Sequence, residues 1–430
     1  MFAEDRLDII IFGATGFTGK HTITQLKKLI KLENLSLTWG IAGRSKARLK
    51  DTLFEIQEET GEDYNEVPVI IADIDDKDSI EKMTASARII INIVGPYIFY
   101  GERVVTACLK SGTHHVDVSG EPQYMEFIQL KYHEAAKNRG IYLVSACGFD
   151  SIPVDLGVVF LQKNFYGTLN SVATYMYMTE DGGPYPGATT DFTTYESAIH
   201  ALAHYKQLRD IRLKLFQEKL PTVEHKLETR CGFFKNKYLE KWCTVYPGSD
   251  RSVSLRTQRY MFTACKQRPI QIQCYVGYDS FLHLLTTIIF GAIILVLSKL
   301  NFTRKLLLKH PKFFSCGLAS HEGPSKQKQE NTTFNVILLG RGWCEILLDP
   351  TDEFYEPPEK LGLARVSGKS PGYGATCLML TMSAIMILTE NDKMPEGGGC
   401  YTPGAAFANT SMIEKLNKHG IKFEINPDDI

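Results

Sequence analysis

Three glycines at regular spacing follow a short apolar run near the start of the chain, and this arrangement narrows the choice of fold. Residues 7–12 read LDIIIF, a run typical of a buried parallel strand. The next seven residues read GATGFTG, and residues 20–30 then carry apolar side chains at helical spacing. A strand, a glycine loop and a helix in this order are the context in which a dinucleotide-binding fingerprint is expected.

Each glycine of the loop has its own physical use. Gly13 permits a sharp turn, Gly16 leaves room for a diphosphate near the backbone, and Gly19 lets the helix lie close to the strand. The amino end of the helix offers N–H groups and a partial positive charge to the phosphates, and two threonine hydroxyls add donors. The residues predicted to hold the diphosphate are Gly13, Thr15, Gly16, Phe17, Thr18 and Gly19.

The second predicted strand indicates which dinucleotide is bound. Residues 38–42 form the next apolar run, and Arg44 follows where an NAD site would have a carboxylate for the ribose hydroxyls. A guanidinium suits a 2′-phosphate, and Ser45 could donate a further hydrogen bond. The alternative is an ordinary basic helix start in solvent. We therefore expect NADP(H), with NAD(H) as the alternative cofactor.

The alternation of apolar runs and helical stretches continues to about residue 150. Further strands are predicted at residues 69–72, 89–94, 115–118 and 142–145. This rhythm is typical of a Rossmann-type α/β fold, a doubly wound parallel sheet with right-handed crossovers.

Residues at the carboxyl ends of these strands are candidates for further cofactor contacts. Asp73 follows the third strand, where it either meets the adenine amino group or caps the next helix. Val94, Gly95 and Pro96 follow the fourth strand, at the edge where open α/β sheets bind ligands.

A reductase of a carbonyl or imine also needs a proton donor. Tyr97 and Tyr100 are the candidate catalytic residues, although Tyr97 could equally form only a wall of the nicotinamide pocket. Asp150 and Ser151 precede an apolar helix start, which favours helix capping over catalysis. No histidine spacing typical of a metal site is found, so no metal is expected.

Several longer motifs point to a family. They read GATGFTG, AGRS, VGPYIFYGE, DVSGEPQ and CGFDSIPVDLG, with GGGCYTPGAAF at residues 397–407. Together they resemble the saccharopine dehydrogenase-like oxidoreductases over almost the whole chain, and more distantly the trans-acting enoyl reductases. The resemblance implies a Rossmann domain, a second α+β domain, an oxidoreductase and association with lipid droplets, but it supplies no substrate.

The later part of the chain predicts a different architecture, because the strand–helix rhythm stops near residue 160. Strands are expected at residues 171–178, 252–262, 270–276 and 333–339, and helices at 194–212 and 373–389. We therefore expect a dinucleotide-binding domain at 1–160, an α+β substrate or dimerisation domain at 161–370 with a hydrophobic insertion at 278–320, and C-terminal helices at 371–430 that return to the first domain. A homodimer is one alternative for the oligomeric state.

Residues 281–297 read FLHLLTTIIFGAIILVL, without a formal charge. A helix of this length would measure roughly 25 Å, slightly short of a hydrocarbon core of about 30 Å. A transmembrane span, a buried core helix and a surface-inserted anchor are the alternatives. The basic stretch that follows, with its Leu and Phe residues, favours the anchor, which keeps both soluble halves on one side. A lipid droplet, bounded by a single phospholipid layer, accepts only that kind of insertion.

Composition and charge argue against a nucleic-acid-binding protein and against a secreted protein. The formal net charge of −1 shows no basic surplus, so no nucleic-acid partner is expected. The ten cysteines include no C-x-x-C pair, and no secretory signal is found at the start. We expect a protein of the lipid droplet surface or of a membrane, facing the cytosol, with the mitochondrion as the alternative.

Two functions follow from this sequence. The first is an NADP(H)-dependent oxidoreductase at a lipid surface, acting on an apolar or lipid-like substrate in lipid metabolism. The alternative is a catalytically silent nucleotide-binding scaffold or sensor on lipid droplets.

Overall fold

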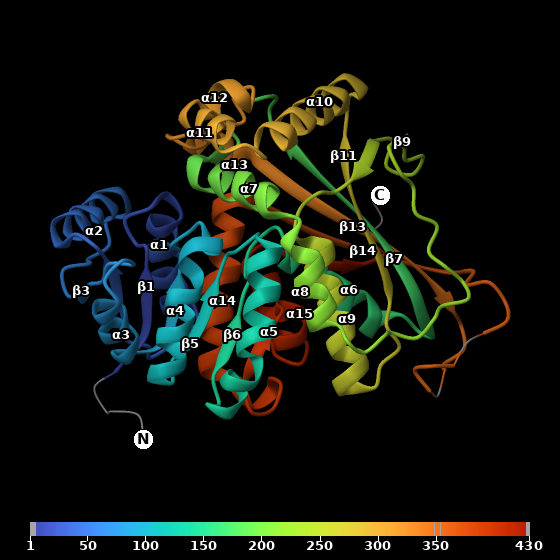
Figure 1. The fold of residues 1–430 in the computed structure, drawn as a ribbon, viewed down its shortest axis with the longest axis horizontal. Coiled ribbons are helices and arrows are strands. Elements are labelled where there is room, and N and C mark those ends of the chain that lie inside the picture. Colours follow the sequence, from blue (N-terminus) through green and yellow to red (C-terminus); the bar gives the residue numbers. More distant parts are fainter. Residues whose placement is uncertain (1–5, 348, 353, 427–430) are drawn as a thin grey trace.

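Alternating strands and helices build a parallel seven-stranded sheet, sheet A, at the amino-terminal side of the molecule (Figure 1). The computed structural model describes residues 6–347, 349–352 and 354–426. The strand order is β15-β6-β5-β4-β1-β2-β3, and every pair is parallel. The strands are β1 (Leu7–Phe12), β2 (Trp39–Gly43), β3 (Val69–Ile71), β4 (Ala87–Asn92), β5 (His114–Asp117), β6 (Tyr142–Val144) and β15 (Gly399–Tyr401).

Helices cover both faces of sheet A, which explains its apolar strands. Ile9, Ile10 and Ile11 are all fully buried although they point alternately to opposite faces. The helices are α1 (Phe17–Leu32), α2 (Lys46–Thr60), α3 (Lys77–Ala85), α4 (Tyr97–Ser111), α5 (Pro122–Asn138) and α6 (Ile152–Asn164). The doubly wound α/β fold expected from the sequence is confirmed.

A second seven-stranded sheet, sheet B, forms the other half of the molecule (Figure 1). Its order is β16-β14-β13-β7-β11-β10-β9; β7 and β11 are parallel, and the other neighbours are antiparallel. The strands are β7 (Thr168–Glu180), β9 (Phe233–Lys235), β10 (Trp242–Val245), β11 (Gln271–Tyr278), β13 (Thr332–Trp343), β14 (Lys360–Lys369) and β16 (Lys422–Ile425). A separate pair joins β8 (Thr190–Asp191) to β12 (Ala319–Ser320).

One predicted strand is wrong. Residues 252–262 lie in helix α9 (Asp250–Cys265), where Val253, Thr257 and Met261 are buried at intervals of four residues. This is the spacing of one helix face. The strand was predicted because the segment contains β-branched and aromatic residues, which are common in strands. The predicted helix at 194–212 is divided into α7 (Phe192–His204) and α8 (Gln207–Leu215).

The C-terminal part of the chain contributes to both sheets. A π-helical turn, η1 (Pro371–Ala375), leads into α14 (Thr376–Thr389), which packs against α1 and the face of sheet A. Strand β15 then becomes the seventh strand of sheet A, and β16 joins sheet B. Helices α15 (Pro403–Phe407) and α16 (Met412–Lys418) lie between these strands, and a 3₁₀ turn, η2 (Asn391–Lys393), follows α14.

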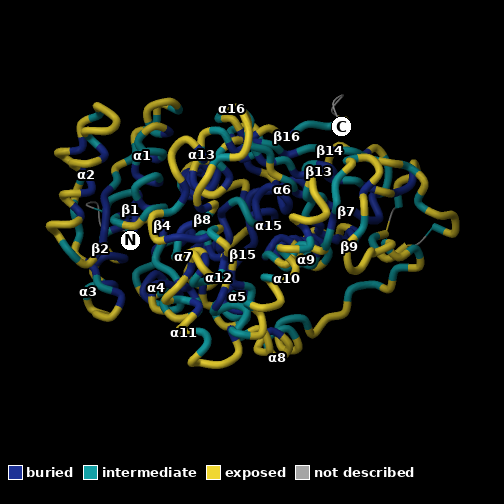
Figure 2. The backbone as a smooth tube through the Cα atoms, turned by 90° about the horizontal axis from the view of Figure 1, so that it is seen from above, coloured by how far each residue is buried: buried dark blue, intermediate teal, exposed yellow. Residues whose placement is uncertain are grey.

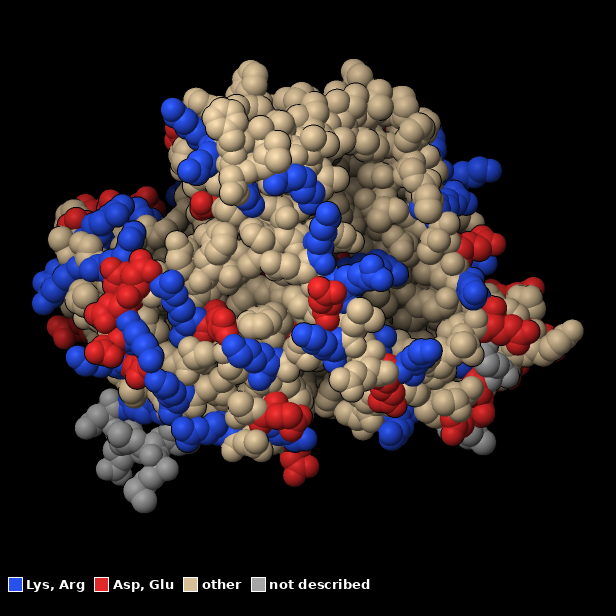
Figure 3. Space-filling model, viewed as in Figure 1, with Lys and Arg blue, Asp and Glu red and all other residues tan. Residues whose placement is uncertain are grey.

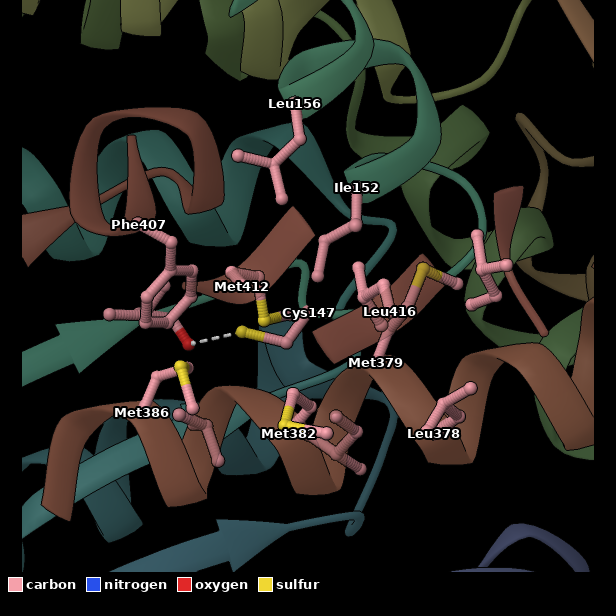
Figure 4. Close-up of a cluster of buried hydrophobic side chains, with 14 of the residues drawn as sticks. Cys147, Ile152, Leu156, Leu378, Met379, Met382, Met386, Phe407, Met412 and Leu416 are labelled. Atoms are coloured by element: carbon pink, nitrogen blue, oxygen red, sulfur yellow. Dashed lines mark hydrogen bonds between the residues drawn. The ribbon is translucent and has the colours of Figure 1, made fainter. Parts of the chain in front are cut away.

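The largest core lies where the two halves of the molecule meet. Figure 2 shows α6 and α15 as buried elements in this region. Helix α14 forms its centre, and the methionines of α14 lie against Cys147, Phe407 and the start of α6 (Figure 4). Residues Pro371–Thr389 are long and apolar enough to cross a membrane, yet 78% of their most apolar window is buried inside the protein. The apolar character of α14 is therefore that of a core helix.

The apolar insertion stands at the top of the molecule (Figure 1). It contains α10 (Phe281–Leu297), α11 (Asn301–Lys309) and α12 (Pro311–Phe314), followed by α13 (Lys326–Asn331). The strands before and after it, β11 and β13, both pair with β7 in sheet B, which argues against a span that separates two halves. Only Leu284 of α10 is buried in the protein, so the buried-core alternative is wrong. Of the three alternatives for this segment, only an element at the protein surface is compatible with this structure.

A buried carboxylate ties the first helix to the C-terminal helix. The Glu33 side chain, 3% exposed, accepts hydrogen bonds from Lys415, from Lys418 at 2.7 Å and from the His419 ring at 2.7 Å. These partners, the lysines first, lower the pKa of Glu33 to about 2. Because the pKa is depressed on folding, the stabilisation is present above the pKa of the unfolded chain and is lost as the pH falls towards 2.

Glu33→Gln is therefore expected to lower the free energy of unfolding by about 2 kcal/mol near neutral pH. The difference from the unmodified protein should shrink at about pH 3, which lies below the pKa of a glutamate in the unfolded chain. Urea unfolding at both pH values measures it, with the exposed Glu58→Gln on α2 as the control. A difference that is the same at both pH values would contradict the assignment.

Candidate functional site

The glycine loop has the geometry of a close backbone turn between β1 and α1. Gly13 has a φ of +94°, a conformation that favours glycine. A Cβ at Gly19 would lie 2.4 Å from the Gly13 carbonyl oxygen and 2.7 Å from the Ala14 carbonyl group. Gly16 is exposed, and its Cβ would meet only the Gly13 oxygen at 3.4 Å. Only glycine fits at Gly19, whereas Gly16 leaves open space in front of the turn.

The amino end of α1 is suited to an anion. Its N-cap is Gly16, no side chain caps it, and its first turn holds no acidic residue. The N–H groups of this turn therefore face the open side with the positive end of the helix dipole behind them. The Phe17 ring packs edge-on against Tyr373 at 4.5 Å, which fixes the turn against η1. These observations fit a bound diphosphate.

The end of β2 lies beside the glycine loop. The Gly13 and Ala14 N–H groups donate to the Ala42 carbonyl oxygen at 3.1 and 3.4 Å. Arg44, just beyond the end of β2, is exposed. The Ser45 hydroxyl instead accepts from the Arg48 N–H at 3.3 Å and so caps α2. Arg44 is thus open to a second anionic group at this position.

The third strand ends in an Asx turn. One Asp73 carboxylate oxygen accepts from the Asp75 N–H at 3.1 Å, and Asp76 caps α3 by accepting from Asp78 and Ser79. The predicted capping role of Asp73 is therefore wrong. Its contact with an adenine amino group stays a prediction.

The loop after β4 touches the glycine loop. A Cβ at Gly13 would lie 3.1 Å from the Ile93 carbonyl carbon and 3.1 Å from Val94 Cγ2. Gly95 and Pro96 follow directly and lead into α4. The loops after β1 and β4 therefore meet at the point where the strand order of the sheet reverses, which is where such sheets bind ligands.

A buried carboxylate occupies the amino end of α4. Glu121, 1% exposed, accepts from the Tyr97 and Ile98 N–H groups at 2.9 and 2.7 Å. Burial raises the pKa of Glu121, while these two backbone donors act in the opposite direction. Glu121 thus neutralises this helix end, which leaves the α1 terminus as the anion site of the two.

Tyr97 is enclosed by the fold. Its hydroxyl donates to the Asn92 carbonyl oxygen at 3.0 Å, and burial raises its pKa well above the ordinary range. A hydroxyl that points at the main chain of its own sheet is poorly arranged to give a proton to a substrate. Tyr100 is partly buried beside Phe99 and Arg103.

The helix-capping role that the sequence predicted for Asp150 and Ser151 is not observed. Ser151 stands at the N-cap of α6, but its side chain makes no capping hydrogen bond. The Asp150 carboxylate accepts from the Tyr246 hydroxyl at 2.7 Å and from Ser249. Sequence reasoning missed Tyr246 and Ser249. The available signal was their turn sequence, YPGSD, which places proline and glycine beside short polar residues.

Two pockets lie away from this edge. One, of about 260 Å³, is lined by residues of α6, α9, α15 and the turn η2, among them Tyr260, Cys265 and Lys393. The other, of about 160 Å³, lies between Glu33, Met382 and Lys415. Neither includes a residue of the glycine loop.

Comparison with known proteins decides the family. Residues 9–144 match the family described as saccharopine dehydrogenase NADP binding domain. The chain is 35% identical to a mouse saccharopine dehydrogenase-like oxidoreductase, with 99% of each chain covered. The chain belongs to the saccharopine dehydrogenase-like oxidoreductase family. It is also 36% identical to a protein of Caenorhabditis elegans named lipid droplet localized protein, with 98% of this chain and 99% of that protein covered.

A solved structure supports the same fold for this family member. Saccharopine dehydrogenase (L-Glu forming) of Saccharomyces cerevisiae matches with a TM-score of 0.56 and 13% identity, covering 98% of this chain and 100% of that chain. This likeness shows the fold alone. The family match identifies the glycine loop and its sheet as a nicotinamide dinucleotide-binding domain.

Proposed function

We propose that this protein is an NADP(H)-dependent oxidoreductase that works at a lipid surface on an apolar or lipid-like substrate. The observation that carries the cofactor assignment is the glycine cradle before α1, with the exposed Arg44 one strand away. When bound, the reduced cofactor supplies a hydride. The first turn of α1 binds the diphosphate, and the Arg44 guanidinium pairs with the 2′-phosphate.

Further residues complete the proposed cofactor site. Asp73 at the end of β3 accepts a hydrogen bond from the adenine amino group. Val94, Gly95 and Pro96 form the wall behind the nicotinamide half, since they lie beyond β4 on the other side of the glycine loop. Tyr97 supports that wall through its bond to Asn92. A homodimer through the second domain stays a prediction.

The surface of the insertion supports the lipid assignment. Figure 3 shows that the top of the molecule, over α10–α12, is formed almost entirely of uncharged residues, with Lys and Arg side chains below it. The exposed large apolar side chains here are Phe281, Leu282, Ile288, Ile289, Ile293, Leu295, Val296, Leu300, Phe302, Leu306, Phe313 and Leu318. A contiguous apolar patch bordered by basic residues is typical of a surface that enters a lipid monolayer.

The name of the worm relative supports a lipid droplet as that surface. We propose attachment that faces the cytosol, with a mitochondrial membrane as the alternative.

Arg44→Ala is expected to weaken NADPH binding about 10- to 100-fold, because one charge-assisted pair with the 2′-phosphate is lost. NADH lacks that phosphate, so its dissociation constant should change by less than about twofold. Titration calorimetry with both cofactors measures the difference. Arg48→Ala, which removes an exposed basic side chain in the first turn of α2, is the matched control. Equal losses for NADPH and NADH would refute the role of Arg44.

The silent scaffold is favoured by one observation, the enclosed hydroxyl of Tyr97. The two functions differ in turnover. Incubation of the protein with NADPH and a cellular lipid extract should consume NADPH if the protein is an enzyme. NADPH that binds but is not consumed with any extract would leave the scaffold as the function.

A further inference from the structure

A tyrosine and a carboxylate from the two halves of the molecule meet at the carboxyl edge of sheet A. Asp150 lies between β6 and α6, and Tyr246 follows β10 of sheet B. The Tyr246 hydroxyl donates to Asp150 Oδ1 at 2.7 Å. Both residues are partly buried, so the pair is neither sealed in the core nor freely hydrated.

The Asp150 carboxylate is held from its other side as well. Ser249 donates to Oδ2 through its N–H at 3.2 Å, and its hydroxyl lies 2.7 Å from the Asp150 main-chain oxygen and 3.1 Å from Oδ2. A Cβ at Gly248 would lie 2.5 Å from Oδ1, so only glycine lets the turn approach so closely. The loop after β5 lies next to the same carboxylate, since a Cβ at Gly120 would lie 3.5 Å from Asp150 Oδ2. Gly120 is exposed and leaves this flank open.

A second carboxyl group stands behind the pair. Asp250, 2% exposed, has one oxygen, Oδ1, without a hydrogen-bond partner among the described residues. Burial, and then the negative charges of Asp150 and Asp155, raise the pKa of Asp250 well above its usual range. Burial also raises the pKa of Asp150. The negative charge of Asp150 thus disfavours ionisation of Asp250 in this poorly solvated site.

The same surroundings keep the phenol protonated before reaction. Burial, and then the negative charge of Asp150, raise the pKa of Tyr246 well above its ordinary range. Tyr246 therefore holds its proton until a stronger base forms next to it, as the heteroatom of a substrate becomes when it gains a negative charge. Tyr97 differs in its partner, since its hydroxyl faces a backbone carbonyl of its own sheet rather than a side chain of the other half of the molecule.

The Tyr246–Asp150 pair lies at the same edge of sheet A as the proposed cofactor site. Parallel strands end at one edge, and the loops after β4, β5 and β6 are neighbours there. The loop after β5 joins them: Glu121 holds the start of α4, and Gly120 faces Asp150. A substrate lying over this loop would contact the nicotinamide wall at Gly95 on one side and Tyr246 on the other.

We propose that Tyr246 is the proton donor of the reduction and that Asp150 positions its hydroxyl. This inference rests on the proposed function. The hydride adds to the carbon of a carbonyl or imine, and the electrons of that double bond move to the heteroatom. The heteroatom takes the Tyr246 proton as the phenol O–H bond breaks. The phenolate then takes a proton from water, so the net consumption is one hydride and one proton.

The test compares tyrosine and aspartate variants of the full-length protein. The probes are hexadecanal and 2-hexadecanone in phosphatidylcholine vesicles, with NADPH as the reductant. Tyr246→Phe should lower kcat about 100-fold, and Asp150→Asn about 10-fold, because the donor or its partner is lost. The KM for NADPH should stay within about twofold, since neither residue touches the proposed diphosphate site.

The matched control is Tyr260→Phe. Tyr260 is another partly buried tyrosine, on α9, and lies about 15 Å along the helix axis from Asp250. The Tyr260→Phe variant should have the same kcat as the unmodified protein. Thermal unfolding and NADPH calorimetry on each variant separate a folding defect from a lost proton donor.

A second readout needs no turnover. In protein without cofactor, the ¹³Cζ resonance of labelled Tyr246 reports the hydrogen bond of its hydroxyl. Asp150→Asn should shift this resonance, and Tyr260→Phe should not.

The outcomes separate the two proposals. No NADPH binding by the unmodified protein would overturn the proposed function. NADPH binding without reduction of either probe would overturn the proton-donor inference and favour the scaffold. Reduction that Tyr246→Phe leaves unchanged, or a resonance that Asp150→Asn does not move, would overturn the inference alone.

Discussion

Gly19→Ala is expected to abolish measurable NADPH binding and to lower the free energy of unfolding by about 3 kcal/mol. The added methyl group would stand 2.4 Å from the Gly13 carbonyl oxygen and 2.7 Å from the Ala14 carbonyl. Both are backbone groups, so no side-chain rotation can relieve the overlap. Helix α1 must move away from β1, and the N–H groups of its first turn then no longer converge on the diphosphate.

Gly16→Ala is the matched control three residues earlier. Its methyl group would lie 3.4 Å from the nearest atom, an ordinary contact, and the residue is exposed with a negative φ. The stability should therefore change by less than about 0.5 kcal/mol. NADPH should still bind about tenfold more weakly, because the methyl group occupies space that the diphosphate needs.

Thermal unfolding and titration calorimetry on both variants measure these effects. The two substitutions are chemically the same, so a difference in stability comes from the position alone. A Gly19→Ala protein that binds NADPH normally would show that α1 and β1 are not held as closely as the loop geometry requires.

The Rossmann half was predictable because its signals are local. The first six strands of sheet A and the helices that follow each of them lie along residues 7–164, whereas β15 joins from residues 399–401 and was not predicted as a strand. The parallel sheet is covered on both faces, which keeps the strands uniformly apolar and easy to recognise. Gly13 and Gly19 contact each other within one short loop, so their spacing alone carried the structural argument.

Sheet B was harder to predict because its pairings join distant segments. The same limit explains the error in α9, whose buried residues Val253 and Thr257 lie one helical turn apart. The residues around them read SVSLRT, and this mixture of apolar and short polar side chains resembles the alternation of a strand. The helical conformation of this segment is stabilised by the packing of α9 against α6 and β11. The sequence of the segment alone does not show those contacts.

The proposed proton donor was hidden for the same reason. Tyr246 and Asp150 are 96 residues apart, and their hydrogen bond forms only when sheet B meets the edge of sheet A. A search for a donor near the glycine loop finds Tyr97, which the fold encloses. The cofactor half of such a site can be recognised from one segment, whereas the substrate half depends on how two domains meet.

The exposed apolar surface of α10 makes a prediction of comparable size. A variant with Leu282→Asp, Ile289→Asp and Val296→Asp is expected to lose more than about 100-fold in affinity for a triolein droplet coated with phosphatidylcholine. These side chains are 66, 48 and 69% exposed, and they recur every seven residues along the helix. Their loss costs the protein little packing, whereas three carboxylates must stay hydrated and cannot enter the acyl layer.

The control carries three aspartates at similarly exposed apolar positions elsewhere, Phe54→Asp, Leu213→Asp and Leu361→Asp, where the side chains are 63, 68 and 68% exposed. It changes the net charge by the same amount, so electrostatic repulsion from the droplet is matched. Flotation of both variants with the droplets measures binding, and NADPH calorimetry checks the fold. If the α10 variant still floats, the exposed surface of α10 is not the attachment surface. Release of the α10 variant alone would mean that α10 enters the lipid, since position is all that distinguishes the two proteins.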